Sequence, residues 1–471
     1  MTNAPPWKTV ALDPDGRRRS EPILAGLPEV PPLSVVVLAV ADPAFLVAGY
    51  EAVLAREAIP LLLHGTTPLA LARRMVERVG AAALLHAPLE GDPHVETAPA
   101  GKARLPERGH LLCTSGTTSK SGEPKVYFFP EARAEANARA HLASLGLADA
   151  RGLRILLPLP VSHAFGLVCG HLAARATGST LLAFTSTPDP ATLLEVAARE
   201  QAQVLHLTPP MVRLLARRHA RRAAPALPEL SLVGVGSAPS TAGEIRTLHR
   251  LFPASRIVAT YGLTECGPRV ATFQAGTAEH PSMLLDVDDA AQVPLGEPLA
   301  GVRLALEDTG SDGVGELVVH TPYVATGRLV DGALEPMPAG PFRTRDAARR
   351  EAYGGITLLG RMDGTIVRGG TNVYPTNVEP LVEDVAGVTG VCLVGQRSPT
   401  YGEVPVLVCE VAAGTHEEEL RRSIEARLAD ELPPTDRPVE IRFVRTLPRT
   451  SLGKVIRAEV KSRLEAPHGS W

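Results

Sequence analysis

Short apolar segments alternate with segments of helical periodicity over about the first 260 residues, and this alternation restricts the fold more than any other feature of the chain. Residues 34–40 and 59–63 have the composition of buried strands, whereas residues 43–57 and 68–80 carry apolar side chains at helical spacing. Further strand-like runs follow at residues 154–160, 180–184, 204–209 and 230–236. Alternation of this kind is typical of an α/β domain whose helices pack on a mostly parallel sheet.

The pattern changes near residue 295. Residues 301–308, 315–321 and 355–360 are short apolar runs separated by Gly, Asp and Pro turns, which predicts a small β-rich subdomain. After residues 360–364 the chain begins a new unit, with strands at 391–395 and 404–412, a helix at 416–432 and a basic tail. We therefore expect two domains, residues 1–361 and a smaller α+β domain of residues 362–471.

Composition limits the possible classes of protein. Of the 471 residues, 45% are hydrophobic and 21% are charged, and the formal net charge is −3, so no general affinity for polyanions is implied and neither nucleic acid nor a membrane is expected as a partner. The spacing of the five cysteines suits neither a zinc site nor a disulfide framework. The first 19 residues lack the apolar core of a signal peptide, and the most apolar stretch, residues 33–55, is interrupted by Asp42, Pro43 and Glu51. A cytoplasmic protein is expected.

Residues 113–126, CTSGTTSKSGEPKV, form a loop rich in small hydroxylic residues directly after the apolar run HLLC. Its glycines permit tight turns, so that successive backbone N–H groups can face one anion, and Lys120 and Lys125 can supply positive charge. The run is not a P-loop, because Glu123 follows Gly122 where that motif requires lysine. From these residues alone, a phosphate-binding loop and a flexible polar linker are both open.

Three further motifs follow in order. They are TYGLTECGP at residues 260–268, FRTRD at 342–346 just before GRMDGTIVRGGTNVYP at 360–375, and LPRTSLGK at 447–454. With the loop at 113–126, this ordered set resembles the adenylate-forming superfamily, which includes acyl-CoA synthetases, aryl-acid ligases, nonribosomal-peptide adenylation domains and luciferase. The resemblance spans about residues 34 to 460.

The resemblance implies that the loop holds the β- and γ-phosphates of ATP. The family pattern is matched by Thr114, Ser115, Gly116, Thr117, Thr118, Pro124 and Lys125. Residues 119–121 are an insertion relative to that pattern, and Val126 replaces its last glycine. The loop also begins earlier in the chain than is usual, which implies an N-terminal domain shortened at its start.

The family joins a carboxylic acid to AMP, releases pyrophosphate, and usually passes the acyl group to a thiol. Lys454 matches the lysine that bridges the carboxylate and the α-phosphate, although by residue type alone it would be an ordinary solvated lysine of the tail. Glu265 matches the carboxylate that suits Mg²⁺, and Thr264 the residue that contacts the α-phosphate. These three are the expected catalytic residues.

Other matched positions imply nucleotide binding. Tyr261 would stack on adenine beside Gly262, Asp346 would accept hydrogen bonds from the ribose hydroxyls, and Arg361 would contact ribose or phosphate. Arg345 stands where the family motif has glycine. The loop that lines both the adenine and the acid is matched by Gly236, Ser237, Ala238 and Pro239.

Asp363 matches the hinge about which the mobile C-terminal domain rotates, and Gly369 and Gly370 match the loop that approaches the acceptor thiol. That thiol would belong to CoA or to the phosphopantetheine of a carrier protein. ATP and Mg²⁺ are the other expected cofactors. Residues 213–225 form a basic run. This run would attract the phosphates of CoA or the acidic face of a carrier protein, or it would simply form a solvated helix face.

Residues 156–167 resemble the acid-pocket motif, in which His163, Phe165 and Gly166 would line the pocket. A core or surface histidine is the alternative for His163. No Asp occurs in this stretch to pair with a substrate ammonium, which disfavours α-amino acids. The pattern favours a non-amino carboxylic acid, aryl or short to medium acyl, with a slight preference for compact or aromatic acids.

Two other functions stay open for this sequence. One is an enzyme that stops at the acyl-adenylate, or passes the acyl group to a nucleophile other than a thiol. A short stand-alone ligase of secondary metabolism fits both this alternative and thioester formation. The other is a nucleotide-binding homologue without turnover, which the loop insertion and Arg345 favour and which Glu265, Asp346 and Lys454 oppose. A monomer or a homodimer is expected.

Overall fold

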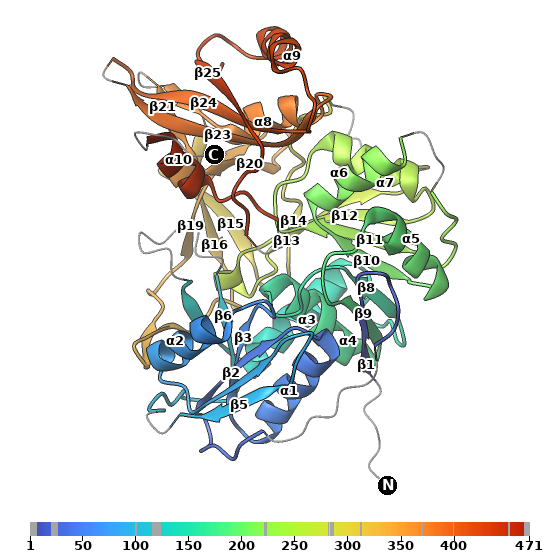
Figure 1. The fold of residues 1–471 in the computed structure, drawn as a ribbon, viewed down its shortest axis with the longest axis vertical. Coiled ribbons are helices and arrows are strands. Elements are labelled where there is room, and N and C mark those ends of the chain that lie inside the picture. The colour runs from blue at the N-terminus through green and yellow to red at the C-terminus, as the bar shows by residue number, and fades with distance from the viewer. Residues whose placement is uncertain are drawn as a thin grey trace.

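The computed structural model describes residues 7–19, 27–98, 101–114, 124–220, 224–280, 282, 287–310, 313–368, 371–398, 400–450 and 453–465. The chain forms a large α/β body, and its C-terminal part forms a smaller body above it (Figure 1). This confirms the predicted α/β architecture. In the part of the chain that the structure describes, no helix is both long and apolar enough to cross a membrane.

One eight-stranded sheet has the order β1-β9-β8-β10-β11-β12-β13-β14, and its first six strands are parallel. The strands predicted near residues 154, 180, 204 and 230 are four of these, and the helices between them cover the sheet. The strands are β1 (Lys8–Leu12), β8 (Arg154–Leu157), β9 (Thr180–Phe184), β10 (Val204–Leu207), β11 (Leu232–Gly236), β12 (Arg256–Tyr261), β13 (Ala271–Gly276) and β14 (Glu297–Pro298). The helices that follow β9, β10 and β11 are α5 (Pro190–Arg199), α6 (Pro209–Arg218) and α7 (Ala242–Leu251).

The apolar pattern does not predict β1. This strand pairs in parallel with β9 along its whole length, from Lys8 opposite Thr180 to Leu12 opposite Phe184. Only Ala11 and Leu12 of β1 are fully buried, so the strand lacks the continuous apolar run that marks its neighbours. Its place at the edge of the sheet explains the weak pattern.

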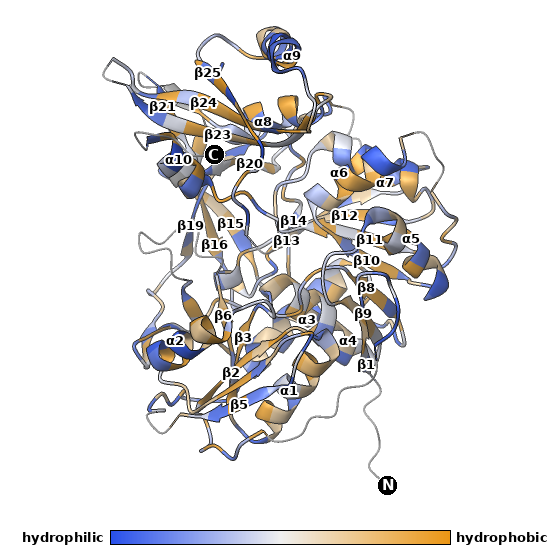
Figure 2. Ribbon diagram, in the orientation of Figure 1, coloured by the Kyte–Doolittle hydropathy of each residue, from blue (hydrophilic) through white to orange (hydrophobic). Residues whose placement is uncertain are grey.

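A second eight-stranded sheet has the order β18-β17-β7-β6-β3-β2-β4-β5, with β2, β3, β4 and β6 parallel. Its strands are β2 (Val35–Val40), β3 (Ile59–Leu63), β4 (Ala83–Ala87), β5 (His94–Thr97), β6 (Gly109–Cys113), β7 (Val126–Pro130), β17 (Gly327–Val330) and β18 (Ala333–Pro336). Its helices include α1 (Pro43–Ala55) and α2 (Leu69–Val79), while α3 (Glu131–Ser144) and α4 (Ala173–Thr177) lie towards the first sheet. A single hydrophobic core joins residues of both sheets, and their strands are largely coloured hydrophobic in Figure 2.

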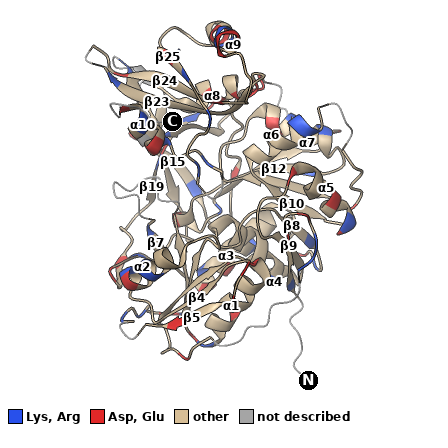
Figure 3. Cartoon of the chain, in the orientation of Figure 1, with Lys and Arg blue, Asp and Glu red and all other residues tan. Residues whose placement is uncertain are grey.

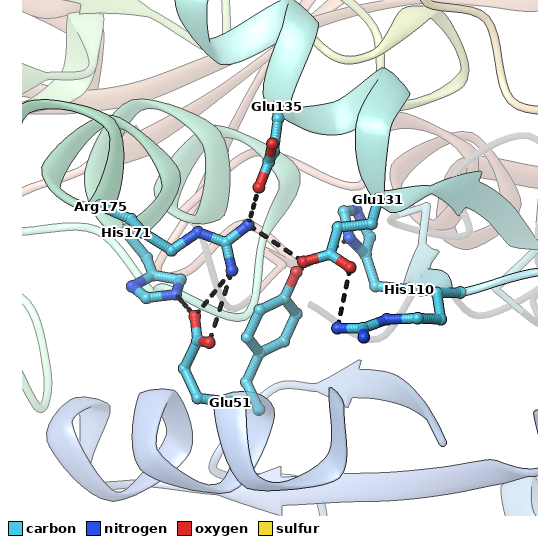
Figure 4. Close-up of polar contacts among 8 residues, drawn as sticks. Glu51, His110, Glu131, Glu135, His171 and Arg175 are labelled. Atoms are coloured by element: carbon cyan, nitrogen blue, oxygen red, sulfur yellow. Dashed lines mark hydrogen bonds and ion pairs between the residues drawn. The ribbon is translucent and has the colours of Figure 1, made fainter. Parts of the chain in front are cut away.

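A half-buried ion network connects the helices of the two sheets (Figure 4). Arg175 of α4 contacts Glu135 of α3 at 2.5 Å and Glu51 of α1 at 3.1 Å. His171, which is fully buried, lies 2.6 Å from the same oxygen of Glu51. Because each charged group has a partner, the network can cross the apolar layer without leaving an isolated charge.

The predicted β-rich subdomain is an antiparallel sheet of order β15-β16-β19-β20. Its strands are β15 (Arg303–Glu307), β16 (Val314–His320), β19 (Phe342–Arg350) and β20 (Ile356–Arg361). This sheet lies between the large body and the C-terminal body in Figure 1.

In the part that the structure describes, the C-terminal body is a five-stranded sheet with three α-helices. The strands are β21 (Ile366–Arg368), β22 (Thr371–Val373), β23 (Val388–Ser398), β24 (Gly402–Val411) and β25 (Glu440–Val444), and the helices are α8 (Pro375–Glu383), α9 (Glu417–Glu431) and α10 (Arg457–Glu465). It has separate hydrophobic clusters on the two faces of the sheet, and α9 presents a charged surface (Figure 3). The domain limits of 361 and 362 stay a prediction.

Candidate active site

The predicted site residues lie on segments that converge from four parts of the chain. They stand at the carboxyl ends of β11 and β12, at the β6–β7 hairpin, where the middle of β19 pairs with the end of β20, and in the tail before α10. The carboxyl ends of parallel strands are where open α/β sheets bind ligands. The site therefore depends on the fold of the whole chain.

Tyr261, Asp346 and Arg361 form a hydrogen-bonded group. The hydroxyl of Tyr261 donates to Oδ2 of Asp346 at 2.6 Å, and Nη1 of Arg361 lies 3.2 Å from Oδ1. Asp346 and Arg361 are partners in the β19–β20 ladder, and only 7% of Asp346 is exposed. Burial, and then the negative charge of Asp346, raises the pKa of Tyr261 well above its usual value, so its hydroxyl stays a donor.

Arg345 adopts a left-handed backbone conformation, with φ of 63°. A residue with a side chain pays a free-energy cost to adopt this conformation, and glycine does not. This accounts for the glycine that the family motif has at this position. Here the amide of Arg345 donates to Oε1 of buried Glu316 at 2.9 Å, and the side chain is exposed. The arginine thus keeps the backbone shape that places Asp346.

Glu265 lies in the short 3₁₀ turn Thr264–Cys266, which follows β12. Burial raises the pKa of Glu265, while the positive charges of Arg361 and Lys125 act in the opposite direction. Burial, and then the charge of Glu265, also raises the pKa of Tyr127 to about 12, which places this unpredicted tyrosine beside the carboxylate. Within the described residues, no group of three or more His, Cys, Asp or Glu side chains could hold a metal ion.

That donor set still fits magnesium. Mg²⁺ is commonly held by one or two carboxylates together with substrate phosphates, and Glu265 is a partly desolvated carboxylate beside two cations that suit phosphate. Thr264, in the same turn, is half-buried. The residues present are therefore compatible with an ion that enters with a nucleotide.

Thr114 and Lys125 close the base of the predicted phosphate loop. The Thr114 amide donates to the carbonyl of Lys125 at 2.9 Å, and the Lys125 amide donates to Oγ1 of Thr114 at 3.3 Å. The antiparallel pair β6–β7 continues directly from these contacts, with Cys113 opposite Val126. The other predicted loop residues, Ser115, Gly116, Thr117 and Thr118, lie outside the described residues.

The loop after β11 shows backbone features of a ligand-binding segment. Ser237 has a left-handed φ of 74°, an uncommon conformation for a residue other than glycine. At Gly236 a Cβ atom would lie 2.6 Å from Oγ1 of Thr260, and at Gly262 it would lie 1.6 Å from the Pro268 carbonyl oxygen. Both glycines are thus required by close packing. Ala238 and Pro239 complete the segment.

Lys454 reaches this site from the C-terminal tail. The Thr450 amide donates to the Lys454 carbonyl at 2.8 Å, and Gly453, with φ of 77°, makes the tight turn before it. Burial, and then the positive charge of Arg269, lowers the pKa of Lys454 to about 8, while Asp346 acts in the opposite direction. No carboxylate within the described residues forms an ion pair with Lys454.

His163 is close enough to Lys454 for its charge to act on the ring, and Phe165, two residues on, is buried. Burial, and then the charges of His64 and Lys454, lowers the pKa of His163 to about 3, so the ring is neutral. Phe165 directly precedes a buried π-helix, Gly166–Leu172, a geometry that is rare and often found at functional sites. A Cβ atom on Gly166 would lie 2.1 Å from the Pro160 carbonyl oxygen, so this turn requires glycine.

Besides Tyr127, the side chains of Asn137, His206 and Arg269 lie near the site and were not predicted. Arg269 is 3% exposed, and its guanidinium carbon lies 4.5 Å from the centre of the Phe165 ring. Asn137 holds the backbone of Arg269 through two hydrogen bonds of 2.8 and 3.1 Å. In the sequence, the feature that could have drawn attention to Arg269 is that it is the one charged residue in the mostly apolar stretch after TYGLTECGP.

Comparisons with known families fit this geometry. Residues 110–329 match the AMP-binding enzyme family, and residues 377–454 match the C-terminal domain of AMP-binding enzymes. The chain belongs to this adenylate-forming family.

Curated relatives of this AMP-binding enzyme include a putative acyl–CoA ligase, YdaB, of Bacillus subtilis, which is 29% identical over 73% of this chain and 65% of the relative. The feruloyl-CoA synthase of an Amycolatopsis species is 29% identical over 75% of this chain and 69% of the relative. The matched region thus spans about two thirds of the length of these curated relatives.

Solved structures share the fold. The anthranilate CoA ligase AuaEII in complex with anthranoyl-AMP has a TM-score of 0.74 at 16% identity, covering 92% of this chain and 88% of that one. The o-succinylbenzoate CoA synthetase of Bacillus subtilis, in complex with its acyl-adenylate, has a TM-score of 0.73 at 20% identity, covering 94% and 90%. At these identities the likeness concerns the fold alone.

The basic run of this AMP-binding enzyme contacts the C-terminal body. Nη2 of Arg217 donates to the carbonyls of Glu383 and Val388 at 3.1 and 2.9 Å, and Arg213 forms an ion pair of 3.1 Å with Glu383. At least this part of the run is therefore a docking surface between the two bodies, which neither interpretation from the sequence anticipated.

Residues predicted for the second half-reaction are described only in part. Asp363 lies in a short 3₁₀ turn, Met362–Gly364, at the junction between β20 and the C-terminal sheet. Gly369 and Gly370 lie outside the described residues. The roles of hinge and thiol-acceptor loop stay predictions.

Proposed function

We propose that this protein uses ATP to convert a non-amino carboxylic acid into an acyl-AMP, and then transfers the acyl group to the thiol of CoA. The observation that carries this proposal is the partly buried ammonium of Lys454. The negative charge of Asp346 opposes the lowering of its pKa by burial, and its own positive charge acts with burial to lower the pKa of His163. The names of several relatives, which are CoA ligases or synthases, support the same reaction class.

The first step must bring a carboxylate to a negatively charged phosphate. Lys454 would lower the repulsion by lying between them, and half-burial makes its charge act in a medium less polar than water. A carboxylate oxygen then bonds to the α-phosphorus as the bond to pyrophosphate breaks. Mg²⁺, held by Glu265 and the phosphates, would neutralise charge on the departing pyrophosphate.

The nucleotide would be oriented by the hydrogen-bonded group already described. Asp346 has two oxygens that can accept from ribose hydroxyls, and Tyr261 and Arg361 fix its orientation. In the second step the CoA thiol gives up its proton, bonds to the acyl carbon, and displaces AMP. A carrier-protein pantetheine would undergo the same chemistry as CoA.

We also propose a cytoplasmic protein that acts as a monomer or homodimer without nucleic acid. Five free cysteines, four of them buried, support a reducing compartment.

The proposal is tested by measuring pyrophosphate release with ATP, Mg²⁺ and a panel of carboxylic acids, followed by thioester formation when CoA is added. We expect at least one acid to release pyrophosphate, and Lys454→Met to remove most of that release while ATP still binds. Purified protein that consumes no ATP with any acid would contradict the proposal, and release without thioester would restrict it to the first step.

A further inference from the structure

Arg269 lies in the interior beyond Phe165, without an anionic partner. Its side chain donates from Nη1 to Oγ1 of Thr260 at 2.8 Å, but its Nε is buried without any hydrogen bond. Across the described residues, no Asp or Glu forms an ion pair with it, whereas the buried carboxylates of Glu200, Glu244 and Asp346 each pair with an arginine. An isolated buried guanidinium is costly, so its presence requires an explanation.

Two histidines beside Arg269 also have buried nitrogen atoms without a hydrogen-bond partner. Both ring nitrogens of His141 and Nδ1 of His206 are buried without a hydrogen bond. His206 packs edge-on against Phe165 at 5.6 Å between centroids, and lies 6.4 Å from His141. Burial, and then the charge of Arg269, lowers the pKa of both rings, that of His206 to about 4, so each is a neutral ring with one N–H to donate.

This arginine–histidine cluster, Arg269 with His141 and His206, stands next to the predicted acid pocket. The guanidinium of Arg269 lies over the ring of Phe165, and a Cβ atom on Gly236 would lie 3.4 Å from Nη1 of Arg269. Together with burial, the positive charge of Arg269 also lowers the pKa of Lys454. Lys454 and Arg269 are therefore two cations within electrostatic reach of each other, and no ion pair among the described residues joins either of them to a carboxylate.

We propose that the acid activated by this protein is a compact dicarboxylic acid, whose second carboxylate binds Arg269 while the first reacts near Lys454. This inference rests on the proposed function and names its substrate class. A distal carboxylate supplies the missing negative charge and can accept from the unused N–H groups of the cluster. Arg269 is far less exposed than Lys454, which favours the distal carboxylate over the reacting one.

The test compares each diacid with its own monomethyl ester, using glutarate as an aliphatic probe and isophthalate as an aromatic one. For at least one pair we expect the wild-type kcat/KM of pyrophosphate release to favour the diacid by about 30-fold or more, the size of effect seen when a buried charge pair loses one partner. Arg269→Met should abolish that preference and leave the ester within about threefold. Arg256→Met, which removes an arginine at the other end of β12, is the matched control and should keep the preference.

Binding measured by calorimetry keeps this inference separate from the proposed function. If the diacid binds wild type and not Arg269→Met, while no acid releases pyrophosphate, the proposed function fails and the diacid site stands. If Arg269→Met weakens binding of the diacid and of its ester equally, the inference is overturned, because Arg269 would then serve the reacting carboxylate or only the fold. A wild-type preference for the ester, or for an acid with a distal hydroxyl or amide, would also overturn it. Arg269→Lys, which keeps the charge, should retain part of the preference and covers the case in which Arg269→Met fails to fold.

Discussion

The hydroxyl of Tyr261 and Oδ2 of Asp346 lie 2.6 Å apart although 85 residues separate them in the chain. The contact joins the end of β12 in the large sheet to β19 in the β-rich subdomain, so the proposed nucleotide site also connects two sheets.

Tyr261→Phe should weaken ATP binding more than acid binding. The change removes one donor from a buried carboxylate, which costs about 1–3 kcal/mol, while Arg361 remains as the second partner. We expect the KM for ATP to rise about fivefold or more, with the KM for the acid changed less than twofold. Steady-state kinetics with each substrate varied in turn would check this, and equal rises in both values would contradict a nucleotide role.

Lys454→Met should remove adenylation and keep the fold. Loss of a cation that stabilises transition-state charge costs about 10²–10³ in kcat. Because burial lowers the pKa of Lys454, its charged form is disfavoured in the folded protein, and replacing it with an apolar side chain should not lower the melting temperature. Pyrophosphate release, ATP binding and thermal unfolding measured on one preparation would check this. Full activity in the variant would exclude the assigned role.

The same lysine predicts an alkaline decline in activity. With a pKa of about 8, its ammonium is present below that pH and is lost above it, so kcat/KM for adenylation should fall as pH rises through about 8. Between that value and the ordinary lysine pKa of 10.5, the unfolded chain binds the proton more tightly than the folded protein does. This group therefore makes unfolding less favourable as pH rises through that range. Lys454→Arg, which stays charged, should lose the decline in whatever activity remains. A wild-type profile flat to pH 10 would contradict this assignment.

Gly262→Ala should be strongly destabilising. The new methyl group would lie 1.6 Å from the Pro268 carbonyl oxygen, and the obstacle is backbone, so the β12 end must move. We expect the free energy of unfolding to fall by about 3 kcal/mol or more, and activity to be lost as well. Gly49→Ala in α1 is the control, because its Cβ would meet only ordinary contacts of 3.6 Å or more and alanine favours helix. Denaturant unfolding of both variants would decide the matter.

Arg217→Ala should slow adenylation more than thioester formation. Arg217 donates to two carbonyls of the C-terminal body in the arrangement that brings Lys454 to the site, so its loss should depopulate that arrangement. We expect adenylation to slow about threefold to tenfold, while thioester formation from synthetic acyl-AMP is unchanged. Arg218→Ala, an exposed neighbour on α6, is the control. Equal slowing of both steps would contradict this account of docking.

Much of the fold was accessible from the sequence because buried strands carry continuous apolar runs. Residues 59–63 and 180–184 are strands with the predicted limits, and the β-rich subdomain follows near residue 295 as expected. The edge strand β1 was missed because only two of its residues are fully buried. Ordered motifs also indicated Tyr261, Asp346 and Lys454, which the fold brings within mutual influence.

The arginine–histidine cluster and the docking contacts could not be predicted. Arg269 lies just after β12, His141 lies in α3 and His206 lies in β10. Only the three-dimensional arrangement makes them neighbours. Likewise, the sequence reveals that Arg213 and Arg217 are basic, but their partner is determined by where α8 lies. Long-range pairing of this kind leaves no local pattern.

The place of β1 has a practical consequence for truncation. Removing the residues before Asp13 would turn β9 into an edge strand, and its segment TLLAF has four buried residues and no charge. An uncovered apolar edge pairs readily with other chains, so a shortened protein should self-associate even though every proposed catalytic group is retained.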